Sequence, residues 1–407
     1  MRQYIFILHL FIGYLICLLF PFYQKLIPLL IVLWAFTFLL IGIRKDFFLK
    51  IYNNKTALFI LLFFLIHVIS LLYTENLASG KFDIESKLSL LVFPIIMSNS
   101  ICFYNKKVID KFFLLFIVGN LFASLYCLFN AFYKWAYLDA SFQYFTYVDL
   151  SHFMHPTYFS MYLSTTLLGC FYLLSKHKLL FNLRSVFYIF SILLFTVMIY
   201  LLSSKAGLIV LCLLIFYFAK FYFKNLKKLI LMAIVLLLIF SGIVASNDRF
   251  SSIKNSVLNT VQNKTTKSDN YSSSEQRIHV WKSTLELLKD NWLIGISAGD
   301  LKYKLTENHY SKKADPEKEK YLNAHNQYLE SFLSVGILGI ILLLSWMIYP
   351  VLYLDYTYRF IIVGLLIIIS INFVFESILN RQEGITFISF FWLLFASKNQ
   401  VLKNKIK

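Results

Sequence analysis

Apolar stretches close to 20 residues long recur along the whole 407-residue chain. A stretch of that length, folded as a helix, crosses the ~30 Å hydrocarbon core of a bilayer. The stretches lack the alternating pattern of a membrane barrel, and an open sheet cannot satisfy its edge groups in lipid. The sequence therefore predicts an all-α integral membrane protein.

The composition supports this class, because 59% of the residues are hydrophobic and only 15% are charged. A soluble domain carries about 25% charged residues. The cysteines all lie within apolar runs, where they are interpreted as small buried hydrophobic residues and not as disulfides or metal ligands. No small-residue cleavage site follows the first apolar run, so that run is predicted to be the first span.

We predict twelve spans, at residues 4–20, 26–43, 57–73, 87–103, 111–133, 157–175, 185–202, 206–223, 228–246, 327–349, 351–375 and 384–397. Residues 1–246 then hold the first nine spans and 327–397 the last three. A large hydrophilic loop at 247–326 separates the two groups, and a basic tail follows at 398–407.

The basic residues of the short loops predict the orientation, because cytoplasmic loops are enriched in lysine and arginine. One set of alternating loops, including both chain ends, carries 20 basic residues, whereas the other set carries six. Both termini are therefore predicted to be cytoplasmic and the large loop to face outward. The net charge of +18 is interpreted as a topology signal that also meets anionic membrane lipids, not as a nucleic-acid footprint.

Within the large loop, an amphipathic helix is predicted near residues 275–289. Ser272 and Glu275 match a capping box. Arg277 lies four residues before Trp281, so the two share a helix face and Arg277 can point toward a cavity at the membrane surface. The plainer alternative is an arginine that snorkels or pairs with a loop carboxylate. The predicted apolar stripe of this helix consists of Ile278, Trp281, Leu285 and Leu288.

His325 is the leading candidate for acid–base chemistry. Asn323 is predicted to cap the tenth span, which would place His325 and Asn326 in its first turn. The helix dipole would then keep the imidazole neutral, and the free amides would favour an anion. The alternative is a lone histidine at the interface without a chemical role.

Three further elements are predicted to face outward. Lys205 lies in a very short turn between two spans, where it either binds an anion or snorkels. Glu376 and Arg381 lie at the outer ends of the last two spans, where they bind substrate or form a self-contained ion-pair network. His155 and Tyr158 lie in the segment 149–158. A metal site is not predicted there, because the histidine spacing is unsuitable and Pro156 breaks the helix.

No nucleotide-binding loop, dinucleotide turn or nucleophile elbow is present in the sequence. The candidate groups instead combine cations that attract phosphate with one neutral imidazole, all on the outward side. This combination suits a lipid-phosphate donor that is attacked by a hydroxyl group.

The sequence around these residues resembles the O-antigen ligase and polymerase family. The resemblance lies in the block from Ala324 to Glu330 followed by residues 336–339, in Arg277 and Trp281 followed by residues 293–296, and in the turn at 204–207.

The resemblance implies a membrane glycosyltransferase (GT-C-like) fold with about twelve spans and one large periplasmic loop, in the bacterial inner membrane. It implies transfer of a glycan from undecaprenyl pyrophosphate to a hydroxyl of lipid A-core or a similar lipid- or glycan-linked acceptor. The reaction would invert the anomeric carbon and need no metal or other cofactor. His325 would act as the general base and Arg277 would hold the pyrophosphate. The residues predicted to bind substrate are Lys205, Asn326, Arg381, Glu376, His155 and Tyr158.

Lys205 stands where the family usually has arginine, which leaves the charge but removes the bidentate fork. A polymerase of the same family is an equal alternative to a ligase. A transporter or flippase of lipid-linked sugars would need ionisable groups near the membrane midplane, where His67 and Glu330 are the candidates. A receptor that only displays the loop would not need His325.

Overall fold

The computed structural model describes residues 2–42, 45–139, 141–176, 182–222, 273–310, 322–353 and 358–406. Within these ranges the regular secondary structure is entirely helical. The longer helices are α1 (Arg2–Leu19), α2 (Ile27–Ile41), α4 (Lys55–Ser70), α6 (Ser89–Ser100), α7 (Lys106–Lys134), α9 (Pro156–Ser175), α10 (Leu183–Leu201), α11 (Lys205–Tyr222), α14 (Ser273–Asn291), α16 (Gln327–Leu352), α17 (Arg359–Phe375) and α18 (Gln382–Ile406). The shorter elements include α3 (Phe47–Asn53), α5 (Leu77–Ser86), α8 (Tyr147–Leu150), α15 (Leu301–Tyr310) and the 3-10 turn η6 (Ile378–Asn380).

A helix occupies each of the eleven predicted spans that fall within the described residues. The span predicted at 228–246 lies outside them. Of the helical segments in the described ranges, six are long and apolar enough to cross a membrane, and α3 with α4 adds a seventh if this pair, bent by 95°, is one span. The prediction of an all-helical membrane protein is therefore confirmed. The six segments are Arg2–Leu19, Gln24–Ile41, Leu77–Phe103, Lys106–Leu138, Leu183–Leu201 and Gln327–Leu352.

Helix α9 is not among the six, and its packing gives the reason. Almost all of its residues are buried inside the bundle, so it faces protein on every side. Its hydroxyl groups are satisfied within the helix, as when Ser164 donates to the Ser160 carbonyl at 2.8 Å and Thr166 donates to the Tyr162 carbonyl at 2.6 Å. A helix surrounded by protein can carry such side chains, whereas a helix facing lipid cannot expose them without loss.

Helices α2 and α10 lie at the outside of the bundle and expose large apolar side chains. On α2, Val32 and Phe36 are 64% and 56% exposed, and on α10 Leu193 is 63% exposed. Soluble proteins rarely present continuous apolar faces of this kind. These faces are suited to contact with lipid chains.

Asparagine residues cap the N-terminal ends of several helices. Asn54, Asn76, Asn105 and Asn182 each accept a hydrogen bond from the backbone N–H three residues later, at the start of α4, α5, α7 and α10. An N-cap satisfies one of the free amides at a helix end. In a chain with few charged residues, these caps set where the apolar helices begin.

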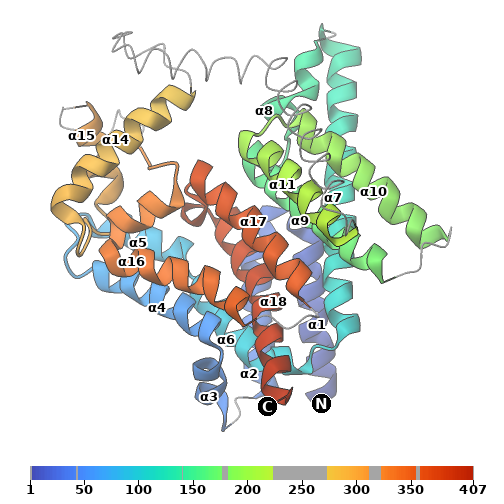
Figure 1. Ribbon diagram of the computed structural model, residues 1–407, viewed down its shortest axis with the longest axis horizontal. Helices are drawn as coiled ribbons and strands as arrows, with labels where there is room; N and C mark the ends of the chain where they lie inside the picture. Colours follow the sequence, from blue (N-terminus) through green and yellow to red (C-terminus); the bar gives the residue numbers. More distant parts are fainter. Residues whose placement is uncertain are drawn as a thin grey trace.

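Aromatic rings fill the centre of the bundle. Phe116 of α7 lies 4.6 Å from Phe391 of α18, and Tyr162 of α9 stacks on Phe387 at 4.3 Å. The two termini lie at the same end of the molecule, and α14 and α15 lie toward the opposite end (Figure 1).

Helix α16 is broken at Val335 and Gly336, where Gly336 has a φ of 67°. The break frees backbone groups that the segment after α14 then satisfies. The Ile296 and Ser297 amides donate to the Leu333 and Ser334 carbonyls at 2.8 and 3.0 Å, and the Ile337 amide donates to the Trp292 carbonyl at 2.9 Å. We call this contact between residues 292–297 and 333–337 the clasp.

Two glycines make the clasp possible. Gly295 has a φ of 85°, and a Cβ on it would lie 2.6 Å from the Ser334 carbonyl oxygen. A Cβ on Gly336 would lie 2.2 Å from the Leu293 carbonyl oxygen. Both positions thus require the left-handed backbone and the close approach that glycine allows. The clasp fixes α14, which carries Arg277, onto α16, which follows His325.

Candidate active site

His325 lies immediately before helix α16. Asn326 is the N-cap residue of this helix, and its side-chain oxygen accepts from the Tyr328 and Leu329 amides at 3.0 and 3.1 Å. Asn323 instead accepts from the His325 amide at 2.9 Å. His325 itself has a φ of 45°, a conformation that turns the chain sharply into the helix.

The prediction that Asn323 caps this helix is therefore wrong, as is the placement of His325 and Asn326 in its first turn. The cap forms at Asn326, whose extended backbone aims its side chain at the free amides. The Asn326 side-chain oxygen is occupied by the cap. His325 thus lies just before the helix, and its imidazole contacts a carboxylate.

That carboxylate belongs to Glu376, which follows α17 directly and is only 7% exposed. One oxygen lies 3.1 Å from Nδ1 of His325, and the other lies 3.6 Å from the Arg277 guanidinium. Glu376 thus connects the two residues that were predicted to be catalytic, which are 48 positions apart in the sequence.

The charge state of Glu376 follows from these neighbours. Burial alone would raise the pKa of this carboxyl, but the hydrogen bond and charge of His325, together with the charges of Arg277 and His155, lower its pKa below the ordinary value of 4.5. Glu376 is therefore a carboxylate at neutral pH. As an anion, Glu376 accepts a hydrogen bond from Nδ1–H of His325, and this contact leaves Nε2 of the ring available.

Arg277 is held in place by helix α14. The Trp281 indole, one turn later, donates to the Ala324 carbonyl at 2.9 Å, which ties α14 to the residue before His325. The predicted apolar stripe is only partly right, because Leu285 is 53% exposed. Leu288 of the predicted stripe is buried, and Val280 and Thr284 are buried beside it, since α15 and α16 pack on that face. Ser272, of the predicted capping box, lies outside the described residues.

Lys205 begins helix α11 and lines a cavity of about 50 Å³ that Arg277 also lines. The turn before it is tight, since Ser203 has a φ of 46° and Ser204 accepts from the Gly207 amide at 3.3 Å. The cavity brings together two cations that are far apart in the sequence. Its other lining residues are Tyr147, Thr157, Ser203, Ser204, Ala206 and Phe375.

His155 and Tyr158 lie at the start of helix α9. His155 is the N-cap residue, and its Nδ1 accepts from the Thr157 amide at 3.3 Å. When its ring is protonated and no longer accepts this bond, its charge acts on Glu376, so His155 belongs to the same electrostatic group. Tyr158 is 2% exposed, and its hydroxyl has no hydrogen-bond partner within the described residues. A buried phenol of this kind is expected to find a partner in a functional state.

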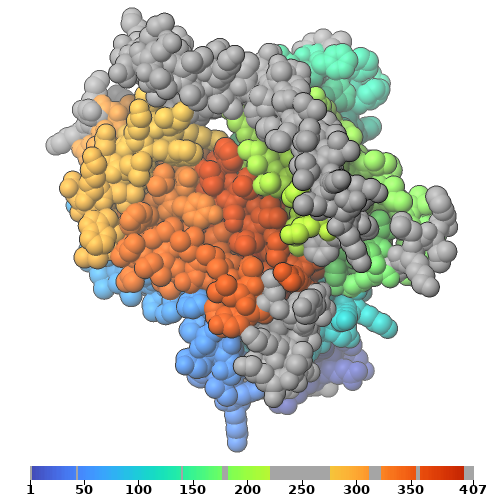
Figure 2. Space-filling view, in the orientation of Figure 1, coloured from blue at the N-terminus to red at the C-terminus, as the bar shows by residue number. Residues whose placement is uncertain are grey.

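Arg381 is exposed between η6 and α18. Among the described residues, the salt bridges of Glu376 connect it to Arg277 and His325 and not to Arg381. We call the turn between α17 and α18, residues 376–381, the hairpin. The alternative of a self-contained ion-pair network within this hairpin is therefore wrong. The charge partner of Glu376 comes from α14, far away in the sequence. The hairpin reaches the surface between the α14–α15 segment and the green helices (Figure 2).

Glu330 was considered only as a midplane group of a transporter, yet it contacts both sides of the site. It is 5% exposed, and its oxygens accept from the Ala324 amide, the Ser377 hydroxyl and the Asn380 side chain at 2.7, 3.2 and 2.5 Å. Gln327 adds a parallel contact, accepting from the Leu379 amide at 2.6 Å. The sequence feature that could have identified Glu330 is a carboxylate within an apolar span, because such a group is costly in a membrane and is usually functional.

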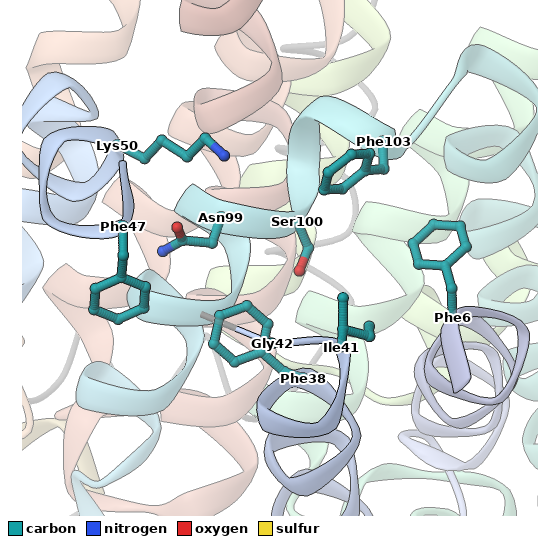
Figure 3. A pocket seen from close by; sticks show the side chains of 9 residues that line it. All are labelled: Phe6, Phe38, Ile41, Gly42, Phe47, Lys50, Asn99, Ser100 and Phe103. Atoms are coloured by element: carbon teal, nitrogen blue, oxygen red, sulfur yellow. The ribbon is translucent and has the colours of Figure 1, made fainter. Parts of the chain in front are cut away.

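Two other cavities do not contain the candidate chemistry. One lies on the other side of Glu330 and is lined by His67 and the ion pair of Asp83 and Lys87, among others. The other is lined by Phe6, Phe38, Phe47 and Phe103, among others (Figure 3). Lys50, the charged residue in its lining, pairs with Asp46 at 3.0 Å.

The segment 149–158 forms no metal site in the structure. Across the described parts of the chain, no group of three or more His, Cys, Asp or Glu side chains is placed to hold a metal ion. The site therefore consists of a histidine, a carboxylate and two cations beside a small cavity.

The sequence was compared with protein-family models. Residues 190–344 match the O-antigen ligase family. The resemblance predicted from the sequence motifs is thereby confirmed. Comparison with curated proteins finds no match.

The O-antigen ligase match includes Lys205, Arg277, His325 and Glu330. It ends before Glu376 and begins after His155, so the structure adds these two residues to the site from outside the matched region. The match implies a glycosyltransferase-like activity of the ligase or polymerase type, on lipid-linked glycans and their acceptors in general. Together with the apolar helices, it indicates a multi-pass membrane protein.

Proposed function

We propose that this protein transfers a glycan from undecaprenyl pyrophosphate to an acceptor hydroxyl at the periplasmic face of a bacterial inner membrane. The observation that carries the proposal is the shared contact of His325 and Arg277 with buried Glu376. A base and a phosphate-binding cation must act on the two ends of one breaking glycosyl bond. A common carboxylate partner keeps them at a fixed separation.

His325 is proposed to act as the general base. With Nδ1–H donated to Glu376, the ring presents an unprotonated Nε2 to the acceptor. The acceptor oxygen attacks the anomeric carbon as its proton passes to Nε2. The bond from that carbon to the phosphate oxygen breaks on the opposite side, so the configuration inverts. Such proton transfer contributes about 10² to 10⁴ in rate.

Arg277 and Lys205 are proposed to bind the pyrophosphate. Both line the same cavity, so their positive charges converge on one space. The leaving pyrophosphate gains negative charge as the bond breaks, and fixed cations stabilise that charge without reorganisation. Neither step needs a metal ion. Tyr158 and His155 lie close enough to Glu376 to bind sugar or phosphate oxygens beside it.

The proposed setting is a GT-C-like membrane glycosyltransferase with twelve spans and cytoplasmic termini. The basic residues of the short loops and chain ends support this orientation, since 20 of them fall on the side of the termini and six on the other. The site would then open toward the periplasm, where a lipid-linked donor is presented.

A transporter of lipid-linked sugars is less consistent with the same contacts. The two ionisable groups that favoured it, His67 and Glu330, are occupied: His67 Nδ1 bonds the Phe63 carbonyl at 2.8 Å, and Glu330 accepts three hydrogen bonds. Alternating access requires such groups to exchange partners between states.

The first prediction tests the proposed chemistry. We expect His325→Ala and Arg277→Ala each to reduce glycan transfer by about 10²-fold or more, while the protein is still expressed and inserted. The measurement is transfer by purified protein from undecaprenyl-pyrophosphate-linked glycan to acceptor. Lys282→Ala, on the exposed face of α14, is the matched control and should transfer normally.

Full activity of His325→Ala would contradict the mechanism. The surface glycans of a deletion strain distinguish the two members of the family. Loss of a ligase leaves uncapped core with accumulated lipid-linked polymer, whereas loss of a polymerase leaves single capped units.

A further inference from the structure

Glu330 lies within the first turns of α16 but does not line the cavity of Arg277 and Lys205. It lines the separate cavity beside Lys87 and Asp83. Any effect of Glu330 on transfer must therefore pass through other residues. Its contacts show which residues those are.

The Glu330 carboxylate connects two segments of the chain. Its Oε2 accepts from the amide of Ala324, the residue before His325, and from the hydroxyl of Ser377, the residue after Glu376. Its Oε1 accepts from the Asn380 side chain in the same hairpin turn. One buried group thus holds the neighbours of both members of the His325–Glu376 pair.

A helix cap alone would not need these contacts. Asn326 already caps α16 through two amides. The contact of Glu330 with Ala324 lies beyond the cap, and the contacts with Ser377 and Asn380 lie in a different part of the chain. The Ala324 backbone is also held on its other side by Trp281 of α14. The segment before His325 is therefore fixed from both sides.

We propose that Glu330 is a positioning residue that sets the separation and orientation of the His325–Glu376 pair. The proposal rests on the assignment of His325 as the general base. All three partners of Glu330 are donors, so both of its oxygens act only as acceptors. A displacement of about 1 Å in such a site costs on the order of 10²-fold in rate.

The test exchanges the carboxylate of Glu330 and the side-chain amide of Asn380 between these two positions. Asn380→Asp alone places a second carboxylate against Glu330, so the two repel and the hairpin moves. We expect kcat to fall on the order of 10²-fold with little change in KM. Adding Glu330→Gln restores one acceptor and one donor at this contact, and the Gln oxygen still accepts from Ala324 and Ser377. The double variant should therefore recover most of the lost kcat.

Glu330→Ala should lose kcat as Asn380→Asp does, and thermal unfolding shows whether it folds. If the double variant is no more active than Asn380→Asp, or if Glu330→Ala keeps normal kcat, the positioning role is overturned. If His325→Ala is inactive, these outcomes reject only the positioning role of Glu330 and leave the proposed function intact. Activity in His325→Ala would instead reject the proposed function on which the inference rests.

Discussion

The Glu376 carboxylate determines the electrostatics of the site at the scale of single residues. It meets an imidazole and a guanidinium that come from different parts of the chain. The sequence identified His325, Arg277 and Glu376 as chemically suitable groups, because His325 and Glu376 stand next to span ends on the predicted outward side and Arg277 stands on the predicted amphipathic helix of the large loop. It could not pair them, because pairing depends on how α14 and α17 pack and not on local pattern.

The second prediction concerns the pH dependence of stability. The pKa of Glu376 is lower in the folded protein than its ordinary value of 4.5, so the folded state binds fewer protons there. Its stabilisation is present above pH 4.5 and is lost as the pH falls through the lowered pKa. Near neutral pH, Glu376→Gln should cost about 1.5–3 kcal/mol, typical of hydrogen bonds to charged groups.

The measurement is the difference in thermal unfolding between the original protein and Glu376→Gln at several pH values. The difference should shrink on acidification below pH 4.5. Glu286→Gln, which changes an exposed carboxylate on α14, should show no such trend. A difference that stays constant down to strongly acidic pH would show that the charge of Glu376 is not involved.

At the scale of elements, the positions of the helices follow from the sequence, whereas their ends and faces do not. Apolar run length was sufficient to locate the helices, since backbone groups in lipid must be satisfied within the segment. The cap at Asn326 was missed because Asn323 and Asn326 are equally good capping residues by type. The buried face of α14 was mistaken because α15, which covers it, had not been predicted.

The third prediction concerns the clasp. Gly336→Ala should destabilise the protein by more than about 1 kcal/mol and reduce transfer, because it combines a positive φ with a collision at the Leu293 carbonyl. Gly42→Ala is the matched control. Gly42 has a φ of 97°, but its nearest neighbour would lie 3.9 Å from the new Cβ.

Thermal unfolding and donor transfer should be measured for both variants. Gly42→Ala should lose only the stability that backbone strain accounts for and should retain transfer. Equal losses in the two variants would mean that strain alone matters and that the clasp has no separate role.

At the scale of the whole molecule, the two termini share one end and α14 and α15 lie toward the other (Figure 1). This arrangement agrees with the orientation that the basic residues predict, in which the candidate site is distant from the cytoplasm. The charge alternation predicts a side for each short loop, because the basic residues of each short loop can be counted separately. It could not show that residues from five helices, α8, α9, α11, α14 and α17, meet beside one cavity.

The fourth prediction tests this orientation. In a background where the native cysteines are replaced by serine, a cysteine introduced by Ser141→Cys should react with a membrane-impermeant maleimide in intact cells. A cysteine introduced by Gln400→Cys, in the basic tail, should react only after permeabilisation. The reverse pattern would place the proposed site on the cytoplasmic side and exclude a periplasmic donor.

The clasp also has a consequence for how the protein is made. The amides of residues 296 and 297 find their acceptors only in residues 333 and 334, which leave the ribosome later. Until that part of α16 has been synthesised and inserted, the clasp cannot hold α14, which carries Arg277, beside the site. A nascent chain that lacks α16 therefore cannot assemble the proposed phosphate-binding side, so the partly made protein should not engage donor lipid before the base is also in place.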